Sequence, residues 1–516
     1  DGLTMAGAIA AFENCKLAFE SKWRKLSSKP SQAVKTQVWN AFKTILLAED
    51  EANIKPKLLF ARNRIVGATS QEEDGQSDST ISWFEPEKDV ANSAIIFVIR
   101  SMFYMDWRYP LSAQATNSGK GRVLSKVFED TVRLLRTAGF QIGLATYDGA
   151  LAHNLVGTNL KTMGIEYWPD PAHCLKKHWT AALKAFGGRM FRTPWGSFNK
   201  EILFKTVILN LNDPFSTIHR IGLNVIEPNS YEKMSVPLAN KFFSIRFAVA
   251  LSKMKTAEGL PDPEAACASR YISWVASWWA LISDRRGFRS QADVNTYVEQ
   301  MASFDFLIEQ WSMLRKADDD SAEMLPVAPD QTRPRRRWAF PSRNLFSDLR
   351  QHFFVVISVL RTQLTHNLQL PLHKMTAGQI GTDIVEHTIG AARAGCGGMR
   401  NLCMDQLLNF FASSQRSAMM NLQMELRTKE GDRMGHARGN RSYSLGHNSP
   451  QISKESTSVN STSGWAVTSH RISTERRTEF EEALSAAEAS LPDDLRILSD
   501  ARTIASNCEP HIVKPH

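Results

Sequence analysis

Hydrophobic positions follow two spacings along this chain, and each spacing predicts a different kind of element. In the first 47 residues, apolar side chains recur every three to four positions on both sides of a polar break at residues 27–31. That spacing is typical of amphipathic helices. We therefore predict two helices between residues 3 and 47.

Short apolar runs rich in β-branched and aromatic residues come next, and they predict strands. The runs lie at residues 44–48, 57–68, 94–100, 107–113, 142–147 and 165–168. Pro110 places the run at 107–113 at the edge of a sheet, because proline cannot donate to a central ladder. Helical spacing at 125–138 and at 151–163 separates the later strands. This alternation predicts an α/β domain with some parallel pairing.

The middle of the chain, from about residue 178 to residue 369, keeps helical spacing throughout. The longest helical stretches lie at residues 239–254, 271–282, 294–314 and 349–364. Tryptophans are frequent here, which suits a packed helical core. A charged loop at 317–340 interrupts the pattern, and helical spacing returns at 382–394 and at 404–426. We expect this middle region to be all-α.

Composition narrows the class of partner and of compartment. The 516 residues include 62 Lys and Arg against 53 Asp and Glu, which gives a formal net charge of +9 and favours a polyanionic partner. The six cysteines form no C-x-x-C pair, which argues for reduced thiols rather than a zinc module or a disulfide framework. No apolar run reaches about 18 residues, so we expect no membrane span.

Three acidic residues stand where carboxylates are able to hold a hard cation. Asp50 follows an apolar run, Asp148 ends the strand at 142–147, and Glu386 lies on the helix at 382–394. Mg²⁺ takes oxygen ligands and keeps several waters, so two or three carboxylates with a substrate phosphate suffice. Two such ions would activate the attacking oxygen and stabilise the leaving oxygen of a displacement at phosphorus. Each residue also has an explanation without chemistry. Asp148 is explained by an Asp-Gly turn, Asp50 by a solvated acidic run, and Glu386 by plain surface charge on its helix.

Four motifs, in this order, resemble the catalytic region of P-element-type transposases, whose members often carry an N-terminal THAP zinc finger. They are LLAEDEANIK at 46–55, TYDGALAHN at 146–154, WPDPAHCLKK at 168–177 and TDIVEHTIGAARAGCGG at 382–398. The resemblance covers about residues 33–411 and is weakest in the helical middle. Because the chain begins at Asp1 rather than at Met, we expect an N-terminal region to be missing from it.

The resemblance implies an α/β fold with an RNase H-like mixed sheet and flanking helices, interrupted by a large all-α insertion domain. It implies a D-D-E triad in which Asp50, Asp148 and Glu386 are catalytic and bind Mg²⁺ or Mn²⁺. The insertion binds GTP in some members, so GTP is a further implied cofactor, although residues 179–370 contain no Walker-type glycine-rich loop. It also implies DNA as the partner, namely transposon ends and target, together with a homo-oligomer and a nuclear location.

These inferences divide the chain into six parts. We expect an N-terminal helical segment at 1–43, the first part of the RNase H-like core at 44–178, the insertion at 179–370, the last core helices with the third acidic residue at 371–427, a disordered linker at 428–474, and a C-terminal helical tail at 475–516 with a helix at 478–489.

The expected function is metal-dependent phosphodiester cleavage and strand transfer by a DNA transposase. Two alternatives stay open: a domesticated, inactive factor that keeps the fold as a DNA- or protein-binding scaffold, and an RNase H-like nuclease without strand transfer. Departures from the family pattern keep them open. Glu49 precedes Asp50, which leaves a one-residue alternative for the first ligand, and His178-Trp179 stand where the family tends to show Arg-Asn.

Basic residues near these motifs are candidates for contacts with DNA phosphates. The candidates are Lys176, Lys177, Arg393, Arg335, Arg336 and Arg337. A basic side chain on a helix or in a loop is more often simply solvated, and that alternative stays open for each of them. His173 is a candidate to orient a phosphate or a metal-bound water, or to satisfy backbone groups at the start of a helix.

Overall fold

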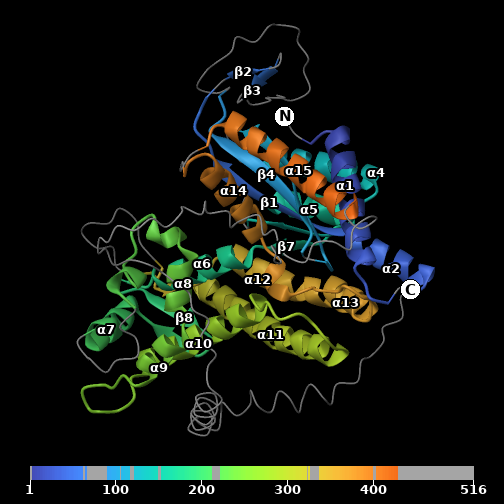
Figure 1. Ribbon diagram of the computed structural model, residues 1–516. Coiled ribbons are helices and arrows are strands. Elements are labelled where there is room, and N and C mark those ends of the chain that lie inside the picture. The colour runs from blue at the N-terminus through green and yellow to red at the C-terminus, as the bar shows by residue number, and fades with distance from the viewer. Residues whose placement is uncertain are drawn as a thin grey trace, which may run out of the picture. The chain divides into compact units, whose positions relative to one another are not determined.

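The computed structural model describes most residues up to Arg427 (Figure 1). The described residues are 3–28, 30–57, 59–61, 64–66, 90–104, 106–116, 121–148, 153–186, 188–211, 221–321, 324–325, 336–398 and 402–427. All of them fall within one compact unit, residues 1–447. The linker predicted at 428–474 and the tail predicted at 475–516 lie outside the described residues.

A five-stranded mixed sheet lies at the centre of the core, with its strands in the order β5-β4-β1-β6-β7. The strands are β1 (Thr44–Asn53), β4 (Ser93–Ser101), β5 (Arg108–Thr116), β6 (Gln141–Tyr147) and β7 (Tyr167–Pro169). β1, β6 and β7 run parallel, whereas β4 pairs antiparallel with both β1 and β5. The α/β prediction is confirmed, and Pro110 lies in the edge strand β5 as expected.

Helices cover one face of this sheet on the side of β4, β1 and β6 (Figure 1). They are α1 (Met5–Arg24), α4 (Gly121–Ala138) and α5 (His153–Thr162). Phe128 of α4 meets Phe97 of β4 edge-to-face, with ring centroids 5.0 Å apart. Val156 of α5 and Phe19 of α1 are buried in the same apolar cluster. The cluster continues beneath α2 (Gln32–Phe42), so both predicted N-terminal helices are confirmed.

The opposite face of the sheet is covered by α14 (Asp383–Gly395) and α15 (Met404–Arg427) (Figure 1). Ile384 and Ile389 of α14 are buried against Ala48 and Ala52 of β1. The helices predicted at 382–394 and 404–426 therefore form, and they pack on β1 although more than 300 residues separate them from it. Outside the sheet, β2 (Leu59–Ala61) and β3 (Arg64–Val66) pair as a short antiparallel hairpin.

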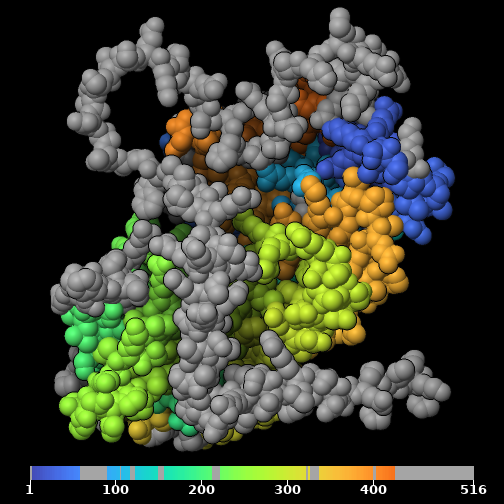
Figure 2. Space-filling model, turned by 60° about the horizontal axis from the view of Figure 1, so that its bottom comes forward, coloured from blue at the N-terminus to red at the C-terminus, as the bar shows by residue number. Residues whose placement is uncertain are grey.

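The middle of the chain is mostly helical, as predicted. Its elements are α6 (Pro171–Ala182), α7 (Lys200–Leu211), α8 (Val236–Phe242), α9 (Ile245–Ser252), α10 (Pro263–Ile282), α11 (Gln291–Ser321), α12 (Arg343–Val355), a π-helical turn (Val356–Leu360), α13 (Arg361–Asn367) and three 3₁₀ turns (Leu223–Val225, Glu232–Met234 and Ala377–Gln379). In the space-filling view, α9, α10 and α11 gather in the green to yellow part of the surface (Figure 2). Tyr271 and Trp311 are fully buried among them.

A small three-stranded sheet interrupts this helical region. The prediction of an all-α region is therefore wrong at these strands. Its strands are β8 (Met190–Thr193), β9 (Gly196–Phe198) and β10 (Trp338–Ala339), in the order β10-β8-β9. Strands of four, three and two residues are too short to show an alternating pattern in the sequence. Pairing between β8 and the distant β10 arises only from the tertiary fold.

α12 covers the outer edge of β7, the strand that leads into the candidate site. His352 donates from Nε2 to the carbonyl oxygen of Pro169 at 2.7 Å, and the Gln351 amide donates to the carbonyl of Tyr167 at 3.2 Å. Burial lowers the pKa of His352 to about 4, so its ring is neutral at physiological pH. These side chains satisfy edge carbonyls that a further strand would otherwise pair with.

Two further observations concern helix length and cysteines in the described part of the chain. Within it, no helix combines the length and the apolar character that crossing a membrane requires. The described cysteines are free thiols, and they are Cys15, Cys174, Cys267, Cys396 and Cys403.

Candidate active site

Three aspartates lie in one row across the three parallel strands: Asp50 within β1, and Asp148 and Asp170 directly after β6 and β7. Ala48 of β1 is in register with Thr146 of β6, which is in register with Trp168 of β7. Because side chains alternate along a strand, residues two positions further on point to the same face as these three. In this row the structure brings together Asp50, Asp148 and Asp170.

The two faces of β1 distinguish Asp50 from Glu49 as the first site residue. Ala48 and Ala52, which alternate with Asp50 on one face, pack in the cluster beneath α14. Leu47, which alternates with Glu49, packs in the cluster on the opposite face. Asp50 therefore points toward α14, and Glu49 is buried in the sheet's other side. Of the two acids, Asp50 is therefore the one on the α14 face, where Glu386 also lies.

The acids predicted from the sequence share one electrostatic environment. Burial first, and then the charges of Glu49, Glu386 and Asp148, raise the pKa of Asp50 to about 8, while the charge of His173 acts in the opposite direction. Side chains affect one another in this way only at short range, because charges further apart are screened. Asp50 on β1 is thus within electrostatic range of Asp148, at the end of β6, and of Glu386, on α14.

Glu386 occupies the first turn of α14, where the helix dipole favours a negative charge. Partial desolvation raises the pKa of Glu386, as does the charge of Asp170. Lys176 and His173 act in the opposite direction and lower it. The side chain remains accessible to solvent, so a substrate is able to reach it.

Asp170 is a central residue of the site that sequence reasoning did not single out. Its buried carboxylate accepts hydrogen bonds from the His173 backbone N–H at 3.0 Å, from His173 Nδ1 at 2.9 Å and from the Thr382 backbone N–H at 3.2 Å. Burial tends to raise the pKa of Asp170, but these bonds hold it below its ordinary value. An aspartate before a proline at a helix start is an N-cap signal, and it was available in the sequence.

His173 links two of the aspartates. Its Nδ1 lies 2.9 Å from Asp170 Oδ2, and its Nε2 lies 3.2 Å from Asp148 Oδ2. Burial tends to lower the pKa of His173, yet the hydrogen bond and charge of Asp170 and the charge of Asp148 raise it above its ordinary value. When the ring is protonated, it donates to both carboxylates and partly balances their charge.

The donor set has the chemistry of a site for hard divalent cations. Carboxylate oxygens are the ligands that Mg²⁺ and Mn²⁺ prefer, and their mutual repulsion raises the pKa of Asp50. Among the residues that the structure describes, no three His, Cys, Asp or Glu side chains are already arranged as a metal-binding group. In these described residues the acids are neighbours, and His173 holds one oxygen of Asp148.

The predicted phosphate-binding lysines differ in their surroundings. Lys176 is largely buried on α6 and is close enough to Glu386 to lower its pKa. Lys177 forms an ion pair with Asp348 of α12 at 3.0 Å. Arg393 lies seven residues after Glu386, and thus on the same side of α14. Lys176 therefore lies beside Glu386, Arg393 lies two turns further along α14, and Lys177 joins α6 to α12.

The predicted arginines of the loop at 317–340 belong to the helical region. Arg336 forms an ion pair with Asp319 of α11. The Arg337 guanidinium lies over the ring of Trp338, 5.0 Å from its centroid. Arg335 lies outside the described residues. The contacts of Arg336 and Arg337 are thus with α11 and β10 rather than with the acids, and their role toward DNA stays a prediction.

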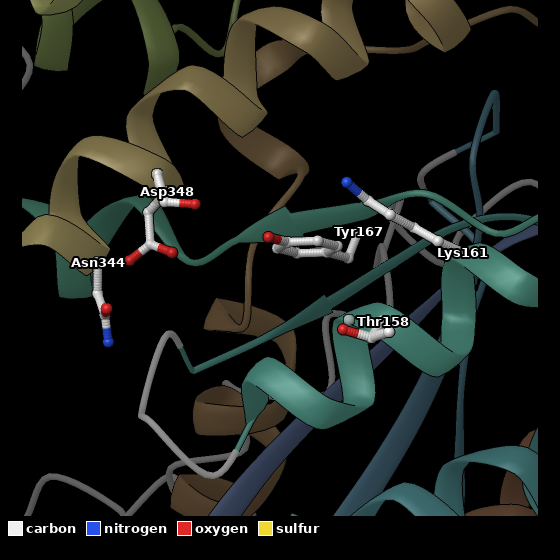
Figure 3. Close-up of a pocket in the computed structure, with 7 residues that line it drawn as sticks. Thr158, Lys161, Tyr167, Asn344 and Asp348 are labelled. Carbon is white, nitrogen blue, oxygen red and sulfur yellow. The ribbon is translucent and has the colours of Figure 1, made fainter.

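A polar cavity of about 230 Å³ lies between the core and the helical region. Thr158 and Lys161 of α5 face Asn344 and Asp348 of α12 across it, with Tyr167 between them (Figure 3). The Lys161 ammonium lies 5.4 Å from the centre of the Tyr167 ring. This cavity is on the α5 side of β7, because Tyr167 and Asp170 point to opposite faces of the strand.

Comparison with solved structures finds a similar fold in the Drosophila P element transposase strand transfer complex. The TM-score is 0.53 at 12% sequence identity, and the match covers 83% of this chain and 94% of that chain. At this identity the likeness concerns the fold, which is of the RNase H-like type predicted from the motifs. No protein-family model matches the sequence. No curated protein sequence matches it either.

Proposed function

We propose that this chain is the catalytic core of a DNA transposase, which cleaves phosphodiester bonds and transfers strand ends with the help of divalent cations. The observation that carries the proposal is that Asp50 is within electrostatic range of both Asp148 and Glu386. They come from three separate parts of the chain, on a fold similar to that of a transposase. Carboxylates so placed are costly to the fold unless they serve a ligand.

Asp50, Asp148 and Glu386 are the residues that we propose hold Mg²⁺ or Mn²⁺. Their oxygen donors suit hard cations, and positive charge would relieve the repulsion that raises the pKa of Asp50. When bound, such cations supply Lewis-acid activation at phosphorus and stabilise charge on the leaving oxygen.

The remaining side chains of the site orient and ionise these acids. Asp170 holds the ring of His173 in one orientation, so that Nε2 faces Asp148. In its protonated form, His173 thereby donates a hydrogen bond to the carboxylate of Asp148. Lys176 lowers the pKa of Glu386 and so favours its ionised form.

DNA is the partner that we propose, as transposon ends and target. The neighbour in the structural comparison is a strand transfer complex, and the net charge of +9 suits a polyanion. A homo-oligomer, a nuclear location and GTP as a second cofactor complete the proposal on the strength of the motif resemblance. The cavity of about 230 Å³ at α5 and α12 is below the roughly 300–1,000 Å³ of typical small-molecule sites, so we do not assign GTP to it.

The test is Mn²⁺ binding and DNA nicking by the full chain and by Asp148→Asn. We expect the variant to lose more than about 100-fold in nicking, above the 10–100-fold typical of losing an outer-shell partner. Its Mn²⁺ affinity should fall as well. Asp130→Asn, at an exposed position of α4, serves as the matched control and should leave both quantities unchanged. Equal nicking by wild type and Asp148→Asn would refute the site assignment.

The alternative function is that of an inactive transposase-derived scaffold. It is favoured by the contact of His173 Nε2 with Asp148, because the ion pair occupies an oxygen that a cation would need. A scaffold would bind DNA or a protein without binding Mn²⁺. DNA binding together with no Mn²⁺ uptake by the wild type would therefore select this alternative. Nicking without joining of the freed 3′ end would instead indicate a nuclease.

A further inference from the structure

α14 packs on an apolar surface formed by β1 and β4. In this surface the small side chains of Ala48, Ala52 and Ala94 lie beside Ile96 and Val98. Apolar attraction has no direction. By itself it does not fix how the helix is turned about its axis. Directional contacts are therefore needed to hold Glu386 opposite Asp50.

One directional contact comes from the β7 side. Asp170 accepts the backbone N–H of Thr382, the residue before the first turn of α14, at 3.2 Å. The preceding Gly381 comes so close that a Cβ there would lie 3.2 Å from the same carboxylate oxygen. A single hydrogen bond does not fix the orientation of the helix, because the helix remains free to turn about that contact.

The second directional contact comes from β4, on the other side of β1. Arg100 is 6% exposed and points to the α14 face, because it is in register with Leu46, two residues before Ala48. Its Nη1 donates to the carbonyl oxygen of Gln379 at 2.6 Å. The charge of Asp383, in the first turn of α14, acts on the same guanidinium.

A buried guanidinium at this place is costly for stability alone. Burial lowers the pKa of Arg100 to about 10, and the group remains charged at neutral pH. Neither Arg100 Nε nor Asp383 Oδ1 has a hydrogen-bond partner among the described residues. Replacing a buried ion pair by apolar residues of similar volume is often neutral or stabilising. The stability of the fold therefore does not explain why an arginine is buried at position 100. Its directional bond to the segment before α14 is what an apolar residue cannot supply.

We propose that Arg100 is a positioning residue that, together with Asp170, sets α14 so that Glu386 faces Asp50. The inference rests on the proposed function, because it assigns Arg100 to the geometry of the same acidic site. The hydrogen bonds from Arg100 to Gln379 and from Thr382 to Asp170 hold the segment before α14 from opposite sides of β1. Arg100 itself touches neither cation nor DNA in this assignment.

The test compares Arg100→Met and Arg100→Lys with the wild-type full chain by Mn²⁺ titration, thermal unfolding and backbone hydrogen exchange. We expect Arg100→Met to keep the fold, to lose about 10-fold or more in Mn²⁺ affinity, and to exchange faster at residues 380–390. Arg100→Lys keeps the charge and one donor, so its Mn²⁺ affinity should lie between those of the other two. A purely structural role would lower the unfolding temperature without this order of affinities.

Arg192→Met is the matched control, because Arg192 is a half-buried arginine that pairs with Asp318 at 2.8 Å in the helical region. It should leave Mn²⁺ affinity and exchange at 380–390 unchanged. Wild-type affinity and exchange in Arg100→Met would overturn the assignment; should that variant not fold, wild-type behaviour of Arg100→Lys would do so. If wild type and Asp148→Asn take up Mn²⁺ equally, the proposed function fails, and the exchange at 380–390 still decides the role of Arg100.

Discussion

The carboxyl group of Asp50 is held in a setting that opposes its ionisation. Its pKa is raised from the ordinary value of 3.8 to about 8, by burial first and then by Glu49, Glu386 and Asp148. Between these two pH values the folded protein binds more protons than the unfolded chain. The free energy of unfolding therefore falls as the pH rises through this window. The acid site is stabilised at low pH and strained near neutrality.

Asp50→Asn should remove this dependence, because the amide has no charge to lose. At pH 8 we expect the variant to exceed wild type in the free energy of unfolding by at least about 1.4 kcal/mol, the value of one pKa unit. The gain should shrink as the pH approaches 5. Denaturant unfolding from pH 5 to pH 8, without divalent cations, measures it. A gain that is equal at all pH values would show that Asp50 does not titrate in this range.

The start of α14 depends on a close backbone contact as well as on the hydrogen bonds of Arg100 and Asp170. The backbone N–H of Gly378 donates to the carbonyl of Asp284 at 2.7 Å, in the 3₁₀ turn before the helix. A Cβ at Gly378 would lie 2.3 Å from the carbonyl oxygen of Ser283, which is backbone and cannot swing aside. Gly390, within α14, has open space around the same position. Glycine is thus required by the packing at position 378 but not at position 390.

Gly378→Ala should destabilise the protein, and Gly390→Ala should stabilise it. We expect the first to cost about 2 kcal/mol or more, within the usual range for overpacking of about 1–3 kcal/mol. The second should contribute about 0.5–1 kcal/mol, because alanine is the better helix former. Thermal unfolding of the two variants, each serving as the control for the other, measures both. Equal effects would mean that the turn before α14 is not packed against residue 283.

Charge is the property of the whole molecule that bears most directly on its partner. The surplus of nine positive charges is a property of the full sequence, whereas the acids of the site are concentrated at the ends of β1, β6 and the start of α14. A polyanion attracted by the overall charge would be repelled by these carboxylates unless cations neutralise them. Binding and cleavage of DNA are therefore expected to respond to different ions.

Binding of duplex DNA should weaken steeply with monovalent salt, because lysines and arginines that neutralise phosphates release counterions. We expect a log–log slope of about −5, which corresponds to five or six phosphates. Fluorescence anisotropy with a labelled duplex at 50–200 mM salt, in EDTA, measures the slope without cleavage. A flat salt response would count against backbone contacts and against DNA as the partner.

Local patterns were enough to predict most elements of the core. The strands at 94–100 and 142–147 and the helix at 382–394 form where their spacing indicates, because burial on one face imposes a period that the sequence displays. Pro110 marked an edge strand because its missing N–H excludes it from a central ladder. Asp50, Asp148 and Glu386 were predicted as a set by the order of their motifs, and not by their spacing.

Contacts between distant segments settled everything that concerns the geometry of the site. Asp170 meets Thr382 across 212 residues, and Arg100 meets Gln379 across 279, and no local period announces such pairs. The direction of Asp50 rather than Glu49 toward α14 followed from which face of β1 the distant helix covers. The strands β8 and β10 pair although each is too short to leave a pattern. The spacing of apolar residues along the sequence shows which side of each helix or strand is buried. The partners of a buried charge depend instead on which surfaces meet after folding.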